Sequence, residues 1–285
     1  MPESTFLRNH CDDECCDMTI GGVPVAAGNP VPVSMAALPV LAAGTAAIGK
    51  IITPTFSASD SLTRPANTTA YAANKAINCN VAVTAFARSG NTITLTAANA
   101  FAVGDRITVA GVNTGFTATN VDGNWVCKTG TTGSVVVFDV TSAPTGATPQ
   151  TITVGTIAKC LSAVVADAVG NGIILSRLSI SLPGIAMTGA VRVYIYTQQT
   201  TCLVDQSIFT LLTANDANRR RYVDLFPITE GAGSDVCFAS ETINEVFQCD
   251  PAETRLYFRV ASEGVGTPAS AGAVTIRVTG EQLLG

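Results

Sequence analysis

LTRPANTTAYAANKAI, residues 62–77, and CLSAVVADAVGNGIILSRLSISLP, residues 160–183, are the two stretches that decide the fold. The first begins like a β-edge, and the second has nearly alternating apolar residues, as a half-buried strand requires: Ile173, Leu175, Leu178, Ile180 and Leu182. Some eighty residues of different texture separate them, with Cys79 and Cys160 on either side. The pattern therefore predicts one β domain interrupted by an inserted β module.

The predicted fold class is all-β. The predicted division of the chain has three parts: residues 1–56 form an extended N-terminal arm and anchoring segment, residues 57–78 with 160–285 form an outer jelly-roll-like β-sandwich, and residues 79–159 form a small inserted antiparallel β domain. A chain of 285 residues is long enough for two compact units. Only 13% of the residues are charged, and Thr, Val and Gly are frequent, which favours strands over helices.

Short alternating segments bounded by Gly, Asn and Pro predict the strands. In the insert these segments are Asn91–Thr96, Arg106–Ala110, Ser134–Val140 and Thr151–Ile157. In the outer domain they are Ala190–Tyr196, Leu203–Leu212, Tyr222–Phe226, Val236–Ala239, Arg255–Val260 and Ala273–Thr279. The single tryptophan, Trp125, lies beside a turn and is interpreted as a core residue in preference to a ligand-stacking one.

The N-terminal arm has two parts. Residues 1–30 show neither helical nor strand periodicity, and Val31–Ile52 is apolar but interrupted by Pro and Gly. This second part is too short for a membrane-spanning helix, which needs about 20 apolar residues, so no membrane contact is expected. Either it packs on its own sheet or it packs on a neighbouring subunit. The acidic N-terminus lacks the basic and apolar regions of a signal peptide.

The charge distribution limits the kinds of partner that the protein can bind. The net charge is −5, and residues 1–17 carry −4 of it, from Glu3, Asp12, Asp13, Glu14 and Asp17 against Arg8. Nucleic-acid binding needs clustered Lys and Arg, so no nucleic acid is expected as a partner. A surface with so little charge solvates poorly, which favours an assembled subunit over a free monomer.

Nine cysteines raise the question of disulfides or metal. If the insert's ends meet, Cys79 and Cys160 should lie within bridging range, with Cα atoms about 4.4–6.8 Å apart. Cys11, Cys15 and Cys16 on the arm point in different directions and are predicted to form at least one inter-chain disulfide. The motif HCDDECC, which begins at His10, suggests zinc, but its adjacent cysteines do not suit one tetrahedral ion. No metal or other cofactor is expected.

Catalytic motifs are missing from the sequence. The only histidine is on the arm, and there is no G-x-S-x-G elbow, P-loop or dinucleotide fingerprint. The sequence does not exclude a pair of glycosidase carboxylates, since the two residues can come from distant positions. Only 6% of the residues are aromatic, however, so few side chains could stack against a sugar ring. The expectation is a protein that is not an enzyme and has no catalytic residue.

Four segments carry a resemblance to a known class of proteins. NPVPVS (residues 29–34), LPVLAAGTAAIGKI (residues 38–51), residues 62–77 and residues 173–182 resemble segments of tailed-bacteriophage virion structural proteins. The resemblance implies a non-enzymatic decoration, neck-collar or fibre protein, assembled into virions in the host cytoplasm. Its implied partners are itself, as a homotrimer, and other virion proteins such as major capsid or neck proteins. The alternatives are a tail-fibre or adhesin-type protein that binds the host surface and, third, a cell-wall glycosidase on the particle.

Overall fold

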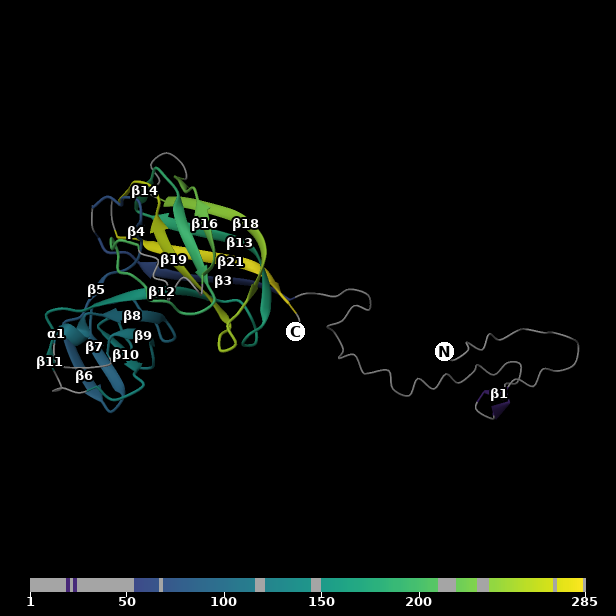
Figure 1. The fold of residues 1–285 in the computed structure, drawn as a ribbon, viewed down its shortest axis with the longest axis horizontal. Coiled ribbons are helices and arrows are strands. Elements are labelled where there is room, and N and C mark those ends of the chain that lie inside the picture. The colour runs from purple at the N-terminus through teal and green to yellow at the C-terminus, as the bar shows by residue number, and fades with distance from the viewer. Residues whose placement is uncertain are drawn as a thin grey trace, which may run out of the picture. The chain divides into compact units, whose positions relative to one another are not determined.

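The computed structural model describes residues 19–20, 23–24, 54–66, 69–115, 121–144, 150–209, 219–229, 236–268 and 271–283 (Figure 1). The chain divides into two units, residues 1–52 and 53–285, which are treated separately. In the first, β1 (Thr19–Ile20) pairs with β2 (Val23–Pro24) in an antiparallel bridge. The predictions for Val31–Ile52 and for Cys11, Cys15 and Cys16 lie outside the described residues.

The unit from residue 53 onwards is built from antiparallel sheets, which confirms the all-β class. One sheet has the order β17-β18-β13-β21-β3, and the second runs β16-β15-β19-β12 and continues into β8-β9. The strands of the first are β3 (Thr55–Thr63), β13 (Gly172–Pro183), β17 (Ile228–Thr229), β18 (Val236–Gln248) and β21 (Ala273–Gln282). Those of the second include β12 (Thr156–Val164), β15 (Val191–Tyr196), β16 (Arg219–Leu225) and β19 (Arg255–Ser262).

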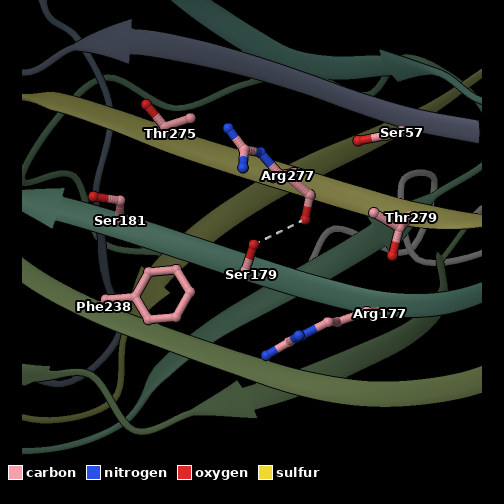
Figure 2. A pocket seen from close by; sticks show the side chains of 8 residues that line it. All are labelled: Ser57, Arg177, Ser179, Ser181, Phe238, Thr275, Arg277 and Thr279. Carbon is pink, nitrogen blue, oxygen red and sulfur yellow. Dashed lines mark hydrogen bonds between the residues drawn. The ribbon is translucent and has the colours of Figure 1, made fainter.

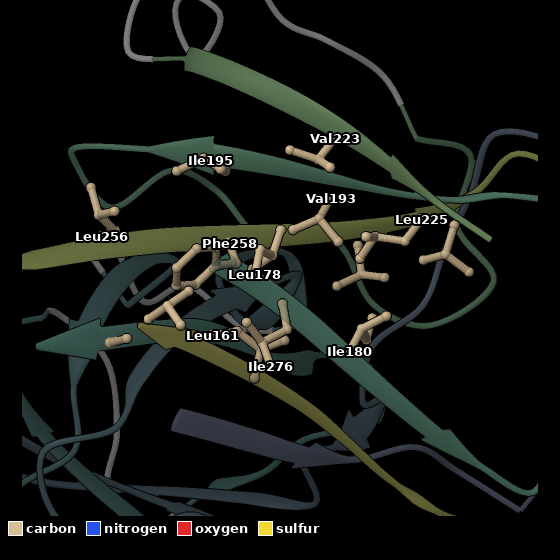
Figure 3. Close-up of a cluster of buried hydrophobic side chains, with 14 of the residues drawn as sticks. Leu161, Leu178, Ile180, Val193, Ile195, Val223, Leu225, Leu256, Phe258 and Ile276 are labelled. Atoms are coloured by element: carbon tan, nitrogen blue, oxygen red, sulfur yellow. The ribbon is translucent and has the colours of Figure 1, made fainter. Parts of the chain in front are cut away.

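These two sheets form a β-sandwich around one buried cluster. Leu178 and Ile276 project from the first sheet, and Val193 and Phe258 project toward them from the second (Figure 3). The buried positions recur at every second residue, except at the bulge between Leu175 and Arg177, because successive side chains of a strand point to opposite faces. Each such side chain contributes about 1.5–3 kcal/mol by leaving water. Three short strands complete this region: β4 (Lys75–Ala76), β14 (Ile185–Met187) and β20 (Gly266–Pro268).

The inserted segment has its own buried cluster, whose members all lie between Cys79 and Ile157. Its strands are β5 (Val81–Ala82), β6 (Ala85–Ser89), β7 (Thr92–Thr96), β8 (Arg106–Ala110), β9 (Gly123–Val126), β10 (Val135–Asp139) and β11 (Gln150–Thr151), with one helical turn, α1 (Val112–Gly115). Strands β6 and β7 form a hairpin with a two-residue turn, in which Gly90 has φ +60°. Glycine accepts that conformation without strain.

One continuous strand joins the two clusters. The first half of β12, Thr156–Cys160, pairs with β8 of the insert, and the second half, Leu161–Val164, pairs with β19 of the sandwich. The insert's entry and exit also lie side by side, because β5 pairs with β12. The proposed boundary at residue 159 therefore falls within a strand, so that backbone hydrogen bonds run from the sandwich into the insert.

Most predicted strands match observed ones, and two do not. Residues 203–209 of the predicted strand Leu203–Leu212 form a loop, in which Phe209 packs against buried side chains of β15 and β19. The apolar residues there belong to a loop that lies on a sheet, and such a loop also buries apolar side chains. The predicted strand Thr151–Ile157 is broken at residues 152–155, where Gly155 has φ +137° and packs closely on Val112.

Candidate functional site

The described part of the chain contains no candidate metal-binding cluster. No group of three His, Cys, Asp or Glu side chains there could hold an ion. The single histidine, His10, lies outside that part, so the HCDDECC motif is not tested. Among the described residues, no helix has the length and apolar character needed to cross a membrane.

A buried ion triad lies where the sandwich meets the insert. Lys159 of β12 contacts Asp60 of β3 at 2.8 Å and Asp105, just before β8, at 2.9 Å. All three side chains are largely shielded from water. Burial alone would lower the pKa of Lys159, but the Asp60 and Asp105 carboxylates raise it above its ordinary value. The lysine is therefore held charged between two carboxylates that come from different parts of the chain.

A pocket of about 680 Å³ opens beside this triad. Its wall includes Leu62 and Thr63 at the end of β3, Asn80 at the start of the insert, and Asn99 and Phe101 of an insert loop. Lys159 also lines it, but both of its neighbouring carboxylates already neutralise that ammonium group. The triad is therefore suited to holding the two parts together more than to activating a substrate.

The cysteines pair differently from the prediction. Cys160 forms a disulfide with Cys202, with Cα atoms 5.6 Å apart, whereas Cys79 is a free, buried thiol. As disulfide candidates, Cys79 and Cys160 are therefore not bonded to each other, although the two chain segments are adjacent: the Lys159 N–H donates to Cys79 Sγ at 3.1 Å. Cys79 lies in the segment between β4 and β5, and the proximity of two chain segments does not ensure that two cysteine side chains meet with bridging geometry.

The disulfide fixes the loop of residues 197–209 to both parts of the molecule. The Cys202 N–H donates to Thr108 Oγ1 of β8 at 2.9 Å, and Gln199 Nε2 donates to the Ile107 carbonyl at 3.1 Å. Further along, the Asp205 N–H donates to the Cys79 carbonyl at 3.1 Å. The loop thus links the second sheet of the sandwich to the insert.

A polar network is buried under the same loop. The Tyr71 hydroxyl donates to Asp205 Oδ1 at 2.5 Å, and the Asn78 N–H donates to the same oxygen at 3.1 Å. Asn78 Nδ2 donates to the Lys159 carbonyl at 2.9 Å. Burial, and then the Asp205 carboxylate, raises the pKa of Tyr71 well above its ordinary value, so the hydroxyl stays protonated. The network fixes the stretch LTRPANTTAYAANKAI against the loop.

The free thiols are unsuited to nucleophilic chemistry. Burial raises the pKa of Cys79 to about 12, that of Cys127 to about 12 and that of Cys249 to about 11. A nucleophilic cysteine needs a thiolate near neutral pH, and these three are protonated there. They act as small apolar core residues.

The outward face of the first sheet carries the second pocket, of about 470 Å³ (Figure 2). Eight side chains from four neighbouring strands line it: Ser57, Arg177, Ser179, Ser181, Phe238, Thr275, Arg277 and Thr279. Arg277 lies opposite Ser179, two residues along β13 from Arg177, which makes the two arginines diagonal neighbours. No acidic side chain lines this pocket.

These two arginines differ from others in the described ranges. Arg106 pairs with Glu253 at 3.7 Å, and Arg192 pairs with Asp224 at 2.6 Å. Every ion pair found among the described residues uses cations other than Arg177 and Arg277. Arg177 Nε instead donates to Ser240 Oγ at 2.5 Å. The face thus presents two positive charges that no carboxylate in that part of the chain neutralises.

The sequence did not point to these features. Cys202 lies 42 residues from Cys160 in a segment without strand periodicity, and no pattern links the two. The alternation of each strand predicts that Arg177 and Arg277 point outward. Their positions on neighbouring strands, however, depend on the pairing of β13 with β21, which the sequence pattern does not give. Trp125 is half-buried and stacks on Phe138 with ring centroids 5.5 Å apart, in keeping with its interpretation as a core residue.

Comparison with protein-family models, with curated proteins and with solved structures gives no match for this chain.

Proposed function

We propose that the protein is a non-enzymatic structural subunit of a tailed-phage particle, which decorates or cements the capsid or the neck. The strand order carries this proposal. The long strands follow one another as β3, β12, β13, β15, β16, β18, β19 and β21, in sheets ordered β18-β13-β21-β3 and β16-β15-β19-β12. This alternation between sheets is that of a jelly roll with an insert between its first two strands, and viral capsid domains commonly use the jelly roll.

Lectins and cupins share that topology, so the particle role needs further support. The clamp between sandwich and insert supplies it. A shared strand, a disulfide-anchored loop and the buried triad of Lys159, Asp60 and Asp105 hold the insert in one orientation. A particle subunit needs such rigidity because its neighbours are fixed, whereas an enzyme that closes on substrate needs a movable junction.

The anchoring role is assigned to residues 1–56, from the sequence. Val31–Ile52 is apolar, and burying 400 Å² of it against a neighbour would contribute roughly 10 kcal/mol before the costs of association. Three arms in a homotrimer would bind with avidity. Oxidation after host lysis would then allow disulfides between neighbouring arms through Cys11, Cys15 or Cys16. Non-reducing electrophoresis of purified particles tests that link: a dimer or larger species is expected, and monomer alone contradicts it.

A truncation tests the proposal. Removing residues 1–53 leaves β3 intact, because that strand begins at Thr55. The truncated protein should fold and lose binding to particles that lack the protein, while the full chain restores normal occupancy. Equal melting temperatures for the two proteins, measured by circular dichroism, exclude misfolding as the cause. Binding of the truncated protein at normal occupancy would show that the β-sandwich itself holds the interface.

One observation favours the alternative role, a tail-fibre or adhesin-type protein that binds the host surface. The outward face with Arg177 and Arg277 has unneutralised charge and hydroxyl groups, which suit a ligand. Copy number separates the two roles. Decoration requires many copies over the shell or a ring at the neck, whereas adhesion requires few copies at the tip of an appendage.

A further inference from the structure

The outward face of the sandwich's first sheet has a composition that the assembly role does not explain. The pocket of about 470 Å³ on it is lined by five Ser or Thr side chains, two arginines and one phenylalanine. The whole chain has a net charge of −5, yet the lining holds two positive charges and no negative one. We call this pocket, with its eight lining residues, the arginine face.

The two arginines of the arginine face share no counter-charge among the described residues, and Figure 2 shows their guanidinium groups on opposite sides of Ser179. Their positions are diagonal on the adjacent strands β13 and β21, and diagonal neighbours are about 7–8 Å apart. Like charges at such spacing repel, and ion pairs elsewhere in the described part of the chain involve other cations. Each guanidinium group therefore favours an anionic partner, which Arg277 can hold through two parallel N–H donors, while Arg177 already donates Nε–H to Ser240 Oγ and keeps its terminal N–H groups for a ligand.

The remaining lining residues indicate what carries that anion. Ser57, Ser181 and Thr275 offer hydroxyl groups that donate and accept hydrogen bonds, as sugar hydroxyls require. Phe238 adds an apolar ring at the side of the pocket (Figure 2). An acidic peptide fits less well, because the backbone groups of β13 and β21 already pair within the sheet. A peptide on this face would leave its own amides to water, whereas peptides that bind sheets do so at the edges.

We infer that the arginine face binds an acidic saccharide, whose carboxylate or sulfate groups contact Arg177 and Arg277. The sugar hydroxyls contact the Ser and Thr side chains, and one sugar face lies against Phe238. This inference concerns a site on the sandwich and does not depend on where the protein sits in a particle.

The test measures binding of the full-length protein by isothermal titration calorimetry. The probes are polygalacturonate, which carries carboxylates, dextran sulfate, which carries sulfates, and neutral dextran. Binding to at least one polyanion and none to dextran is expected, and the preferred polyanion identifies the acidic group. The double variant Arg177→Gln with Arg277→Gln should bind at least about tenfold more weakly, because hydrogen bonds to charged groups are lost.

Matched controls make the result specific. Lys128→Gln removes one exposed positive charge of the insert, and Phe226→Ala removes an exposed ring outside the pocket, so both should bind as the original does. Phe238→Ala should weaken binding without abolishing it. Arg277→Lys keeps the charge but loses the planar pair of donors, and it should bind more weakly than the original.

Three results would overturn the inference: no binding to either polyanion, unchanged binding by the double arginine variant, or an equal loss in Lys128→Gln. A fourth outcome assigns the face to another occupant. If a synthetic peptide of residues 1–17, which carries −4, binds the face more tightly than both polyanions, the acidic arm of a second copy is its ligand and the saccharide inference fails. Circular dichroism melting confirms that each variant folds.

Discussion

The sandwich and the insert are both antiparallel β structures with a buried core, but they achieve stability differently. The strands β13 and β18 of the sandwich have 12 and 13 residues, whereas no strand wholly within the described residues of the insert has more than five. Short strands bury less apolar surface and make fewer ladder hydrogen bonds. The insert compensates through β12, the Cys160–Cys202 loop and the buried triad. The sandwich is therefore the scaffold, and the insert depends on it.

Truncating one core residue in each region tests that dependence, with the largest expected effect. Phe258→Ala in the sandwich and Phe138→Ala in the insert should each cost about 3–5 kcal/mol, because both rings are buried. Trp125 is the only tryptophan, so its fluorescence reports the insert, while circular dichroism reports all strands. Phe258→Ala should lower the midpoints of both the circular dichroism transition and the Trp125 fluorescence transition. Phe138→Ala should lower chiefly the midpoint of the Trp125 fluorescence transition.

The control for this pair is Phe226→Ala, whose ring is 71% exposed and whose loss should change little. If Phe258→Ala lowers the circular dichroism transition while Trp125 unfolds as before, the insert folds without the sandwich. That outcome would contradict the dependence inferred above.

Removing the disulfide should have the next largest effect. Cys202→Ala removes a cross-link between two positions that are 42 residues apart in the sequence. The expected loss is about 2–4 kcal/mol of unfolding free energy. Chemical denaturation with and without reductant measures it. Reductant should destabilise the original protein to the level of the variant and leave the variant unchanged. Equal stability of the original protein and the variant, each with and without reductant, would show that residues 197–209 stay in place without the disulfide.

The triad comes third. Lys159→Met leaves Asp60 and Asp105 facing each other without a cation, at an expected cost of about 2 kcal/mol. That is less than for a fully enclosed pair, because both carboxylates retain some water contact. Adding Asp60→Asn and Asp105→Asn should recover part of the loss, since the repulsion is then gone. No recovery would mean that Lys159 acts through packing alone.

The triad also predicts a pH dependence. The pKa of Lys159 is raised in the folded protein, so its contribution is complete below the ordinary lysine pKa of about 10.4 and is lost as the pH rises through the higher folded value. The difference in unfolding free energy between the original and Lys159→Met should therefore be constant from pH 7 to about pH 10 and shrink above it. A difference that shrinks near neutral pH would contradict this assignment.

Thiol reactivity should show the smallest effect. Cys79 and Cys127 of the insert have pKa values of about 12 and are buried, so alkylation by iodoacetamide at pH 8 must await local opening. Mass-spectrometric peptide mapping should find both unmodified in the native protein and modified in guanidinium. Faster labelling of Cys127 in Phe138→Ala would confirm that the insert opens by itself. Rapid native labelling of Cys79 would show that the junction is loose.

The strands were the predictable part of the fold. Alternation at Arg106–Ala110 and Ala273–Thr279 identified β8 and the first seven residues of β21, because a sheet with one buried face imposes that period. The apolar content of Leu203–Leu212 gave a wrong strand prediction over residues 203–209, since a loop lying on a sheet also carries apolar side chains such as Phe209.

The junction was less predictable, because it depends on contacts between distant segments. The outer pattern resumed near Cys160, where the pairing of β12 passes from β8 to β19, but the disulfide partner Cys202 came from a loop without periodicity. A lysine within the apolar run of β12 was the only local sign of the triad. Its partners could be identified only once β3 and β8 were placed around it.

Particle localisation tests the central claim most directly. A tag after Gly285, detected by immunogold labelling on gradient-purified particles released by cells that produce the tagged protein, leaves the proposed anchoring arm untouched. The proposal predicts many labels over the shell or a ring of labels at the neck, and the protein in the particle fraction. Label confined to appendage tips would favour the adhesin role. Protein found only in the soluble fraction, with unlabelled particles, would contradict the structural role.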